Sequence, residues 1–239
     1  MSHFDAGSGQ IVARAGEDER ANFIKRTYVH LAGAIAVFAL LETVLIQTGM
    51  GAKLATLIFS AGGFGWLIVM GLFMVVSTVA NNWALSGVSR EKQYMGLGLF
   101  IIAEAIIFTP LIYMALLRDP SGTLLQNAAV VTAALVGGLT FTAFSTKINF
   151  SFMGRFLMIG GFVAMGIIVA AILFKFSLGL WFSGAMILFA AGSVLYSTSN
   201  IIHEYHTEQH VAASLSLFSS VGLLFWYILQ FMMSMGGDD

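Results

Sequence analysis

Residues 176–202, FSLGLWFSGAMILFAAGSVLYSTSNII, decide the fold because this stretch contains no Asp, Glu, Lys, Arg or His. About 20 apolar residues in a helix span the ~30 Å hydrocarbon core of a bilayer. Further uncharged stretches occupy residues 54–89, 120–146, 156–174 and 211–237. The sequence therefore predicts a protein that crosses a membrane several times.

The composition agrees with this prediction. Of the 239 residues, 58% are hydrophobic and 10% are charged, whereas a soluble domain has roughly 25% charged residues. The chain contains no cysteine, which excludes disulfides and thiolate metal or redox sites. The net charge of −1 gives no indication of a nucleic-acid partner, so the lipid bilayer is the one partner that composition implies.

We expect an all-α membrane protein with seven transmembrane helices, since the ten-residue alternating strands of a membrane barrel are absent. Residues 1–26 are interpreted as a short solvated tail, residues 27–235 as the transmembrane domain and residues 236–239 as an acidic C-terminal tail. The predicted spans are residues 28–47, 55–80, 94–116, 124–145, 156–175, 179–201 and 211–235.

The distribution of Lys and Arg predicts the orientation, because cytoplasmic loops carry more of them. A cytoplasmic N-terminus places eight of the eleven basic residues on the cytoplasmic side and leaves Lys53, Arg118 and Lys175 on the other. Seven spans then put the C-terminus outside.

Glu104, in the stretch FIIAEAIIFTPLIYM (residues 100–114), lies about ten residues, or ~15 Å, into its predicted helix. A charged side chain near the bilayer midplane costs ~2.5–3.5 kcal/mol, so it should face the bundle interior. Burial favours the neutral form of a carboxyl, which suits proton-linked gating. The alternative is a protonated carboxyl bonded to a neighbouring helix. Pro110 removes a backbone donor, and the freed carbonyl either meets a cation or water or reflects a packing kink.

Glu42 is a second candidate for an ion path. It lies about 9 Å by helical rise from Thr48 at the outer end of the first span, where we expect partial hydration. His30 lies at the cytoplasmic edge of the same span and is expected to make interfacial contacts. The glycine group Gly62, Gly63 and Gly65 is expected to permit tight helix packing, and the four tryptophans are interpreted as ordinary membrane aromatics.

The last two predicted helices carry serines at helical spacing, and their short connection predicts antiparallel neighbours with a polar seam. Such a seam either holds the helices together or lines a narrow aqueous path. The predicted seam residues are Ser193, Ser197, Asn200, Ser216, Ser219 and Ser220.

Residues 200–210, NIIHEYHTEQH, contain three histidines between these two helices. The order HEYH differs from the HExxH of zinc hydrolases, in which the histidines lie at i and i+4. We therefore interpret this segment as a polar turn and expect no metal site.

Four stretches together resemble the transmembrane Bax inhibitor motif family. They are FIKRTYVHLAG at 23–33, AEAIIFTPLIY at 103–113, TFTAFSTKINFSF at 140–152 and LYSTSNIIHEY…SLSLFSSVGLLFWYIL at 195–229. The resemblance covers the chain from about residue 23 onward. It implies a bundle with the last helix at its centre, a bacterial inner membrane, and a pH-sensitive calcium leak.

In studied family members a pair of aspartates on the last two helices shares a proton and controls the pore. Matching the motifs places Ser197 and Ser220 at these two positions, and Asn149 at the aspartate of a Lys-x-Asp-Phe-Ser motif. Serines do not titrate and offer Ca²⁺ only neutral oxygens, whereas Ca²⁺ takes six to eight oxygen ligands, commonly including carboxylates. The family's calcium switch cannot operate here in that form.

Two hypotheses remain open. The first is a pH-modulated cation leak, carrying calcium or protons, with Glu104 as the titratable group. The second, drawn from some bacterial relatives, is a non-conducting protein that modulates a membrane-anchored AAA quality-control protease through its exposed N-terminal tail. We expect no enzyme and no cofactor, because no nucleophile–base pair, cofactor loop or metal-ligand set is visible.

Overall fold

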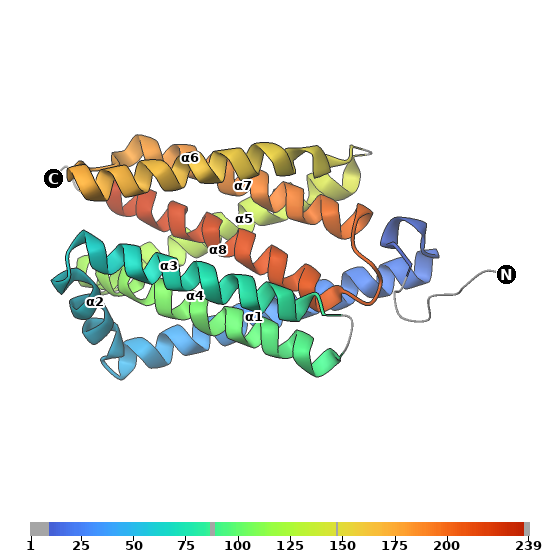
Figure 1. Ribbon diagram of the computed structural model, residues 1–239, viewed down its shortest axis with the longest axis horizontal. Helices are drawn as coiled ribbons and strands as arrows, with labels where there is room; N and C mark the ends of the chain where they lie inside the picture. The colour runs from blue at the N-terminus through green and yellow to red at the C-terminus, as the bar shows by residue number, and fades with distance from the viewer. Residues whose placement is uncertain (1–9, 87–88, 147, 237–239) are drawn as a thin grey trace.

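The computed structural model describes residues 10–86, 89–146 and 148–236, and within these residues the protein contains helices and no strand. Seven helices are long and apolar enough to cross a membrane, so the chain is an all-α membrane protein (Figure 1). These helices are α1 Glu17–Gln47, α3 Gly63–Ala84, α4 Arg90–Arg118, α5 Thr123–Ser145, α6 Met153–Phe174, α7 Gly179–His203 and α8 His210–Met235. The short helices are η1 Val12–Arg14, α2 Met50–Ser60 and η2 Phe150–Phe152.

The second predicted span, residues 55–80, is wrong at its start. The chain forms the short helix α2, turns at Gly62, and then begins the transmembrane helix α3 at Gly63. Gly62 has φ of +60° and ψ of −151°, a conformation that essentially only glycine adopts. This glycine therefore redirects the chain between α2 and α3. The expected tight packing is wrong for Gly62, which has open space around it, and holds for Gly63 and Gly65, where a Cβ would collide with Ile172 and Ile58.

The solvated tail expected over residues 1–26 is shorter than predicted. Helix α1 already begins at Glu17, and Val12 is fully buried. The backbone N–H of Val12 donates to Tyr205 O at 2.9 Å, and that of Thr207 donates to Gln10 O at 3.0 Å. Residues 10–14 are thus fastened to the α7–α8 loop. Part of the predicted tail, residues 1–9, lies outside the described residues.

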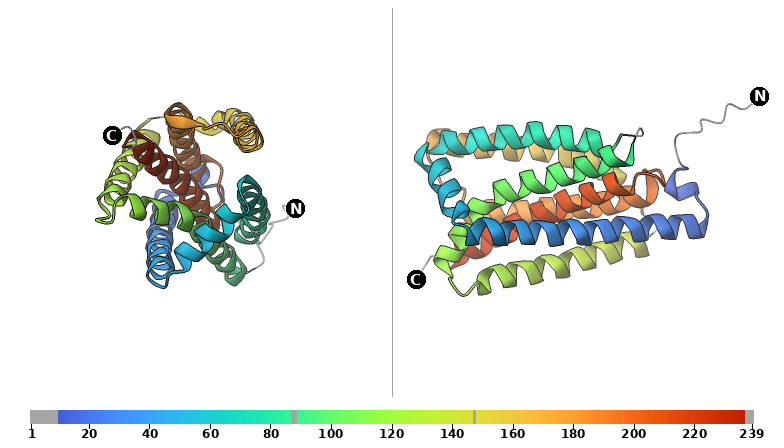
Figure 2. Two further views of the ribbon diagram at one scale, coloured as in Figure 1. Left: turned by 90° about the vertical axis from the view of Figure 1, so that its left-hand side faces the viewer. Right: turned by 90° about the horizontal axis from the view of Figure 1, so that it is seen from below.

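Helix α8 is the centre of the bundle, as expected. In the apolar part of α8 61% of the residues are buried, compared with 56% for α4 and at most 22% for the other spans. Helix α8 packs against α1, α3, α4, α5 and α7, and Figure 2 shows it running between them. Helix α6 lies at the periphery, where it packs on α7 and meets α3.

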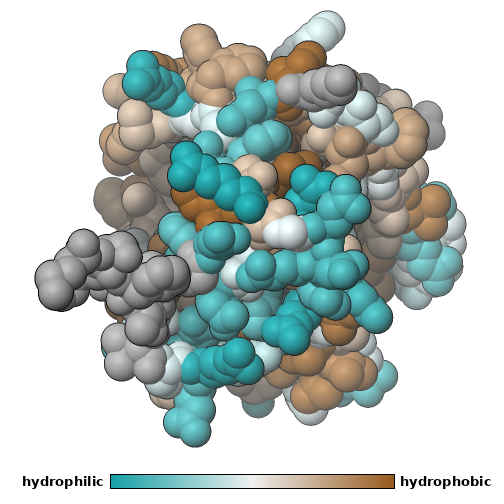
Figure 3. All heavy atoms as spheres, turned by 90° about the vertical axis from the view of Figure 1, so that its right-hand side faces the viewer, coloured by the Kyte–Doolittle hydropathy of each residue, from teal (hydrophilic) through white to brown (hydrophobic). Residues whose placement is uncertain are grey.

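The surface has the division that a bilayer requires. Large apolar side chains are exposed along the spans, for example Phe162 at 74% and Leu188 at 76%. Hydrophilic residues gather over the end of the bundle where α1 and α4 begin (Figure 3). Helix α1 starts at this end and α8 finishes at the opposite one (Figure 1), as an odd number of spans dictates.

Candidate functional site

Glu104 is buried inside the bundle, with 4% of its surface exposed. It projects from α4 onto α8, where the missing side chain of Gly222 leaves room for the carboxyl group; a Cβ at that position would collide with Glu104 Oε1. Among the residues that the structure describes, Glu104 Oε2 is buried and has no hydrogen-bond partner. The expectation that Glu104 faces the interior is confirmed, whereas a bond to a neighbouring helix is not found for this atom.

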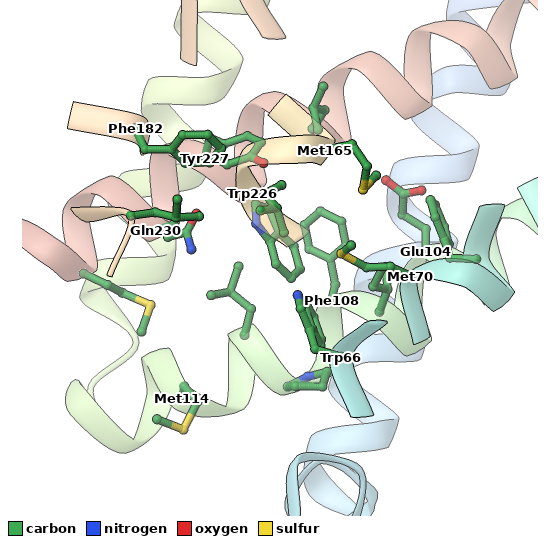
Figure 4. Close-up of a pocket in the computed structure, with 18 of the residues that line it drawn as sticks. Trp66, Met70, Glu104, Phe108, Met114, Met165, Phe182, Trp226, Tyr227 and Gln230 are labelled. Carbon is green, nitrogen blue, oxygen red and sulfur yellow. The ribbon is translucent and has the colours of Figure 1, made fainter. Parts of the chain in front are cut away.

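A cavity of about 660 Å³ begins at Glu104. It is lined mainly by α3, α4, α6, α7 and α8, and its walls are largely aromatic, aliphatic and methionine side chains (Figure 4). The lining extends to Arg118 at the end of α4 and Ser234 near the end of α8. The cavity therefore runs from the middle of the bundle towards the end that carries the C-terminus.

Pro110 lines this cavity and is fully buried. Helix α4 nevertheless continues through Pro110 from Arg90 to Arg118. Proline removes one intrahelical donor, and the buried ring contributes to the cavity wall about 1.7 turns beyond Glu104. Its place in the wall fits the packing alternative, and a carbonyl role in ion binding stays a prediction.

Glu42 is not partly hydrated, which corrects the sequence-based expectation. Only 5% of its surface is exposed, and its Oε2 lies 3.1 Å from Thr109 Oγ1 on α4. The same hydroxyl lies 2.7 Å from Ala105 O, and one hydroxyl hydrogen cannot serve both acceptors fully. A protonated Glu42 that donates to Thr109 through Oε2 leaves the Thr109 hydrogen for Ala105 O, while Glu42 Oε1 stays buried without a hydrogen-bond partner among the described residues. Glu42 does not line the cavity, so the geometry gives it an interhelical bond between α1 and α4.

Four serines join α7 to α8 through their hydroxyl groups. Ser220 Oγ lies 2.9 Å from Ser197 Oγ and 3.1 Å from Ser193 Oγ, and Ser216 Oγ donates to Ser197 Oγ at 3.2 Å. The predicted polar seam between antiparallel neighbours is confirmed for these four residues. The prediction is wrong for two others. Ser219 lines the cavity instead, and Asn200 accepts a hydrogen bond from Ser151 at 2.8 Å.

The four-serine network is electrically neutral and closed. Ser220 donates to the carbonyl oxygen of Ser216 at 3.0 Å, Ser193 and Ser197 can each donate to Ser220, and Ser216 donates to Ser197. Each hydroxyl hydrogen is then used once. Four neutral oxygens committed to one another are a poor substitute for the carboxylates that Ca²⁺ prefers.

The polar turn expected at residues 200–210 is confirmed over residues 204–209. Helix α7 ends at His203 and α8 begins at His210, so the three histidines do not share one helical face. His30 contacts two side chains of the bundle: its Nε2 lies 2.9 Å from Tyr94 Oη, and its ring centroid lies 5.0 Å from that of His210. Its interfacial contact stays a prediction.

Asn149 has a local structural role. Its Oδ1 accepts hydrogen bonds from Ser151 N at 2.9 Å and from Ser199 Oγ at 3.3 Å. These contacts cap η2 and tie it to α7, and they need only an acceptor oxygen.

No pattern in the sequence indicates the aromatic wall of the cavity. Trp66 and Trp226 stack with ring centroids 5.7 Å apart, and Phe108 meets Trp226 edge-on at 5.0 Å. These residues come from three different helices, so no spacing along the chain links them. Their interpretation as ordinary membrane aromatics missed this shared site.

The fold and the site together define a multi-pass, all-α membrane protein with a buried carboxyl beside its central helix. The family model described as "Inhibitor of apoptosis-promoting Bax1" matches residues 20–237, and the chain belongs to this Bax inhibitor family. The family resemblance seen in the motifs is thereby confirmed.

Known relatives come from bacteria, fungi and plants. The chain is 30% identical to the uncharacterized protein PA2604 of Pseudomonas aeruginosa over 71% of this chain and 72% of that one. It is 25% identical to Bax inhibitor 1 of Schizosaccharomyces pombe, with 73% and 64% covered, and 25% identical to protein LIFEGUARD 3 of Arabidopsis thaliana, with 88% and 83% covered. No solved structure matches the chain.

Proposed function

We propose that this protein is a pH-modulated cation leak in which Glu104 is the titratable group of the path. The observation that carries the proposal is the position of Glu104 at the inner end of a cavity that reaches one end of the bundle. A buried, ionisable side chain within a membrane marks an ion or proton path by default. Its unpaired Oε2 leaves an acceptor for a proton or a cation.

The described arrangement corresponds to a closed state of such a path. Between Glu104 and the opposite end, α8 contributes the buried side chains of Ser214, Leu215, Leu217 and Phe218. Conduction requires movement there, and the serine network between α7 and α8 is the bond set that such a movement would break. Because this network lacks carboxylates, we expect protons or monovalent cations to pass more readily than Ca²⁺.

Flux into proteoliposomes tests the proposal. Vesicles loaded with a pH dye or a calcium dye, and assayed over a range of external pH, should show a cation flux in the wild type that changes with pH. Glu104→Gln should abolish this flux, because the amide keeps the shape of the carboxyl group and cannot exchange a proton. The matched control is Glu42→Gln, the other buried carboxyl, which lies outside the cavity and should retain the pH dependence. Equal flux in Glu104→Gln and wild type, or no wild-type flux above empty vesicles, would end the proposal.

For localisation we propose the bacterial inner membrane, with the N-terminus in the cytoplasm and the C-terminus outside. The basic residues Arg14, Arg20 and Arg26 lie at the end where α1 begins, in keeping with the excess of Lys and Arg on cytoplasmic loops. The chain has no cysteine, so single cysteines introduced at either end can be labelled from outside intact cells. Labelling at the α1 end in unpermeabilised cells would reverse the assignment.

The second candidate, modulation of a membrane-anchored AAA protease, keeps one favourable observation. The first turn of α1 presents Glu17, Asp18 and Glu19 to solvent beyond the bundle, which offers a partner an acidic surface. Residues 10–14 are hydrogen-bonded to the α7–α8 loop, so the free N-terminal tail that this hypothesis requires is shorter than expected. Crosslinking from position 18 in native membranes should recover the protease, and a clean negative result counts against this candidate.

A further inference from the structure

The cavity beside α8 holds two polar side chains that lack partners. Glu104 Oε2 and Gln230 Oε1 both line an otherwise apolar space, are buried, and have no hydrogen-bond partner among the described residues. A buried acceptor left unpaired carries a desolvation penalty. Gln230 lies eight residues beyond Gly222 on α8, or about 12 Å along the helix. The cavity thus offers acceptors at two levels, and no donor of the described residues bonds to either of them.

The walls between these acceptors suit an organic cation. The faces of Trp66, Phe108 and Trp226 cluster at the centre of the cavity (Figure 4), and aromatic faces attract cations through their quadrupoles. Met70 and Met165 complete this part of the lining. Methionine side chains are flexible and polarisable, so they adapt to ligands of differing shape.

The positions of the charged residues in the cavity lining favour a cationic ligand over an anionic one. Among the described residues that line the cavity, Glu104 is the one acid and Arg118 the one base. Arg118 is exposed at the end of α4, 14 residues or about 21 Å of helical rise from Glu104. An anionic amphiphile would stop at Arg118 and leave both buried acceptors unpaired. A cation that passes the mouth stabilises the ionised form of Glu104 and pairs with it.

We propose that this cavity binds a lipophilic organic cation, namely a primary amine carried on an apolar aromatic body. The ammonium group donates to Glu104, and the body lies against Trp66, Phe108 and Trp226. The volume of about 660 Å³ falls within the range of about 300–1,000 Å³ that is usual for sites of drug-sized ligands. This binding goes beyond the cation leak and does not require the protein to conduct.

Two fluorescent probes of matched shape test the proposal on the full chain in lipid nanodiscs. Dansylcadaverine carries a primary amine, and the dansylamide of 5-aminopentan-1-ol replaces the ammonium by a hydroxyl group. Energy transfer from Trp66 and Trp226 to the dansyl group reports binding, and empty nanodiscs give the partitioning background. We expect the amine to bind at least about tenfold more tightly than the alcohol, the effect of one charge-assisted hydrogen bond.

Variants assign the site. Glu104→Gln should remove the difference between the probes, while Glu42→Gln, which alters a buried carboxyl outside the cavity, should preserve it. Met165→Trp fills the cavity and should weaken both probes without touching the carboxyl, with circular dichroism confirming the helical content. Equal affinity for amine and alcohol, an unchanged preference in Glu104→Gln, or undiminished binding in Met165→Trp overturns the proposal. The binding measurement does not depend on flux. If the protein binds the amine but does not conduct, the cation-leak proposal is refuted and the binding proposal is kept.

Discussion

Ser220→Ala decides whether the serine network holds α7 against α8. Ser220 makes two side-chain contacts across the helix pair, at 2.9 Å to Ser197 and 3.1 Å to Ser193. Interhelical hydrogen bonds in membranes average about 0.6 kcal/mol. Loss of both should therefore lower the free energy of unfolding by about 1.2 kcal/mol. Ser193→Ala removes one contact and should cost about half as much.

Reversible unfolding in mixed micelles of increasing denaturing-detergent fraction measures these differences. The matched control is Ser219→Ala, one residue away on α8, because that side chain lines the cavity and has no place in the four-serine network. Its free energy of unfolding should change by less than that of Ser193→Ala. If Ser220→Ala is no more destabilised than Ser219→Ala, the network does not hold the helices together. The same variants assayed for flux test the alternative that the serines line an aqueous path. If the serines only hold α7 against α8, their loss should not reduce the flux. If they line the path, their loss should reduce it.

Three further predictions concern other parts of the chain. Val12→Asp places a charge in a fully buried position and should detach residues 10–16 from residues 204–209. Amide hydrogen exchange should then be faster in both segments and stay slow in α8. Unchanged exchange in both segments would contradict the attachment of residues 10–14 to the α7–α8 loop. Gly62→Ala forces a side chain into the φ +60° conformation and should cost about 1–3 kcal/mol of unfolding free energy, whereas Gly71→Ala, inside α3 with open space around it, should not destabilise. Hydrogen bonds from Ser121 and Leu124 hold the pKa of Asp119 below its ordinary value. Because the folded-state pKa is depressed, this contribution is present above the unfolded-state pKa and is lost as the pH falls through the folded-state pKa. The α4–α5 turn should therefore loosen only in acid, and an NMR titration that gives Asp119 an ordinary or raised pKa would contradict the turn geometry.

The sequence was sufficient to predict the class of fold because hydrophobic length is a local property. Each uncharged stretch is long enough to cross a bilayer by itself, and the interior position of Glu104 follows from the cost of a charge in hydrocarbon. The serine seam was also predictable, since helical spacing and a short turn bring α7 and α8 together. Boundaries were less accurate where a single backbone conformation decides them, as at Gly62, or where a tail folds back, as at Val12.

What only the tertiary structure decided is which distant residues share a space. In the sequence, Glu42 and Glu104 are both lone acids in apolar helices and differ only in their expected depth in the membrane. Packing places one against Thr109 and the other in a cavity against Gly222. The cavity itself, with Trp66 and Trp226 from separate helices, has no local signature, because it depends on how helices far apart in the chain cross one another. Whether a segment crosses the bilayer depends on its own hydrophobic length, so the sequence determined the seven spans. Side-chain contacts between segments form only when the helices pack together, and these contacts determined the site.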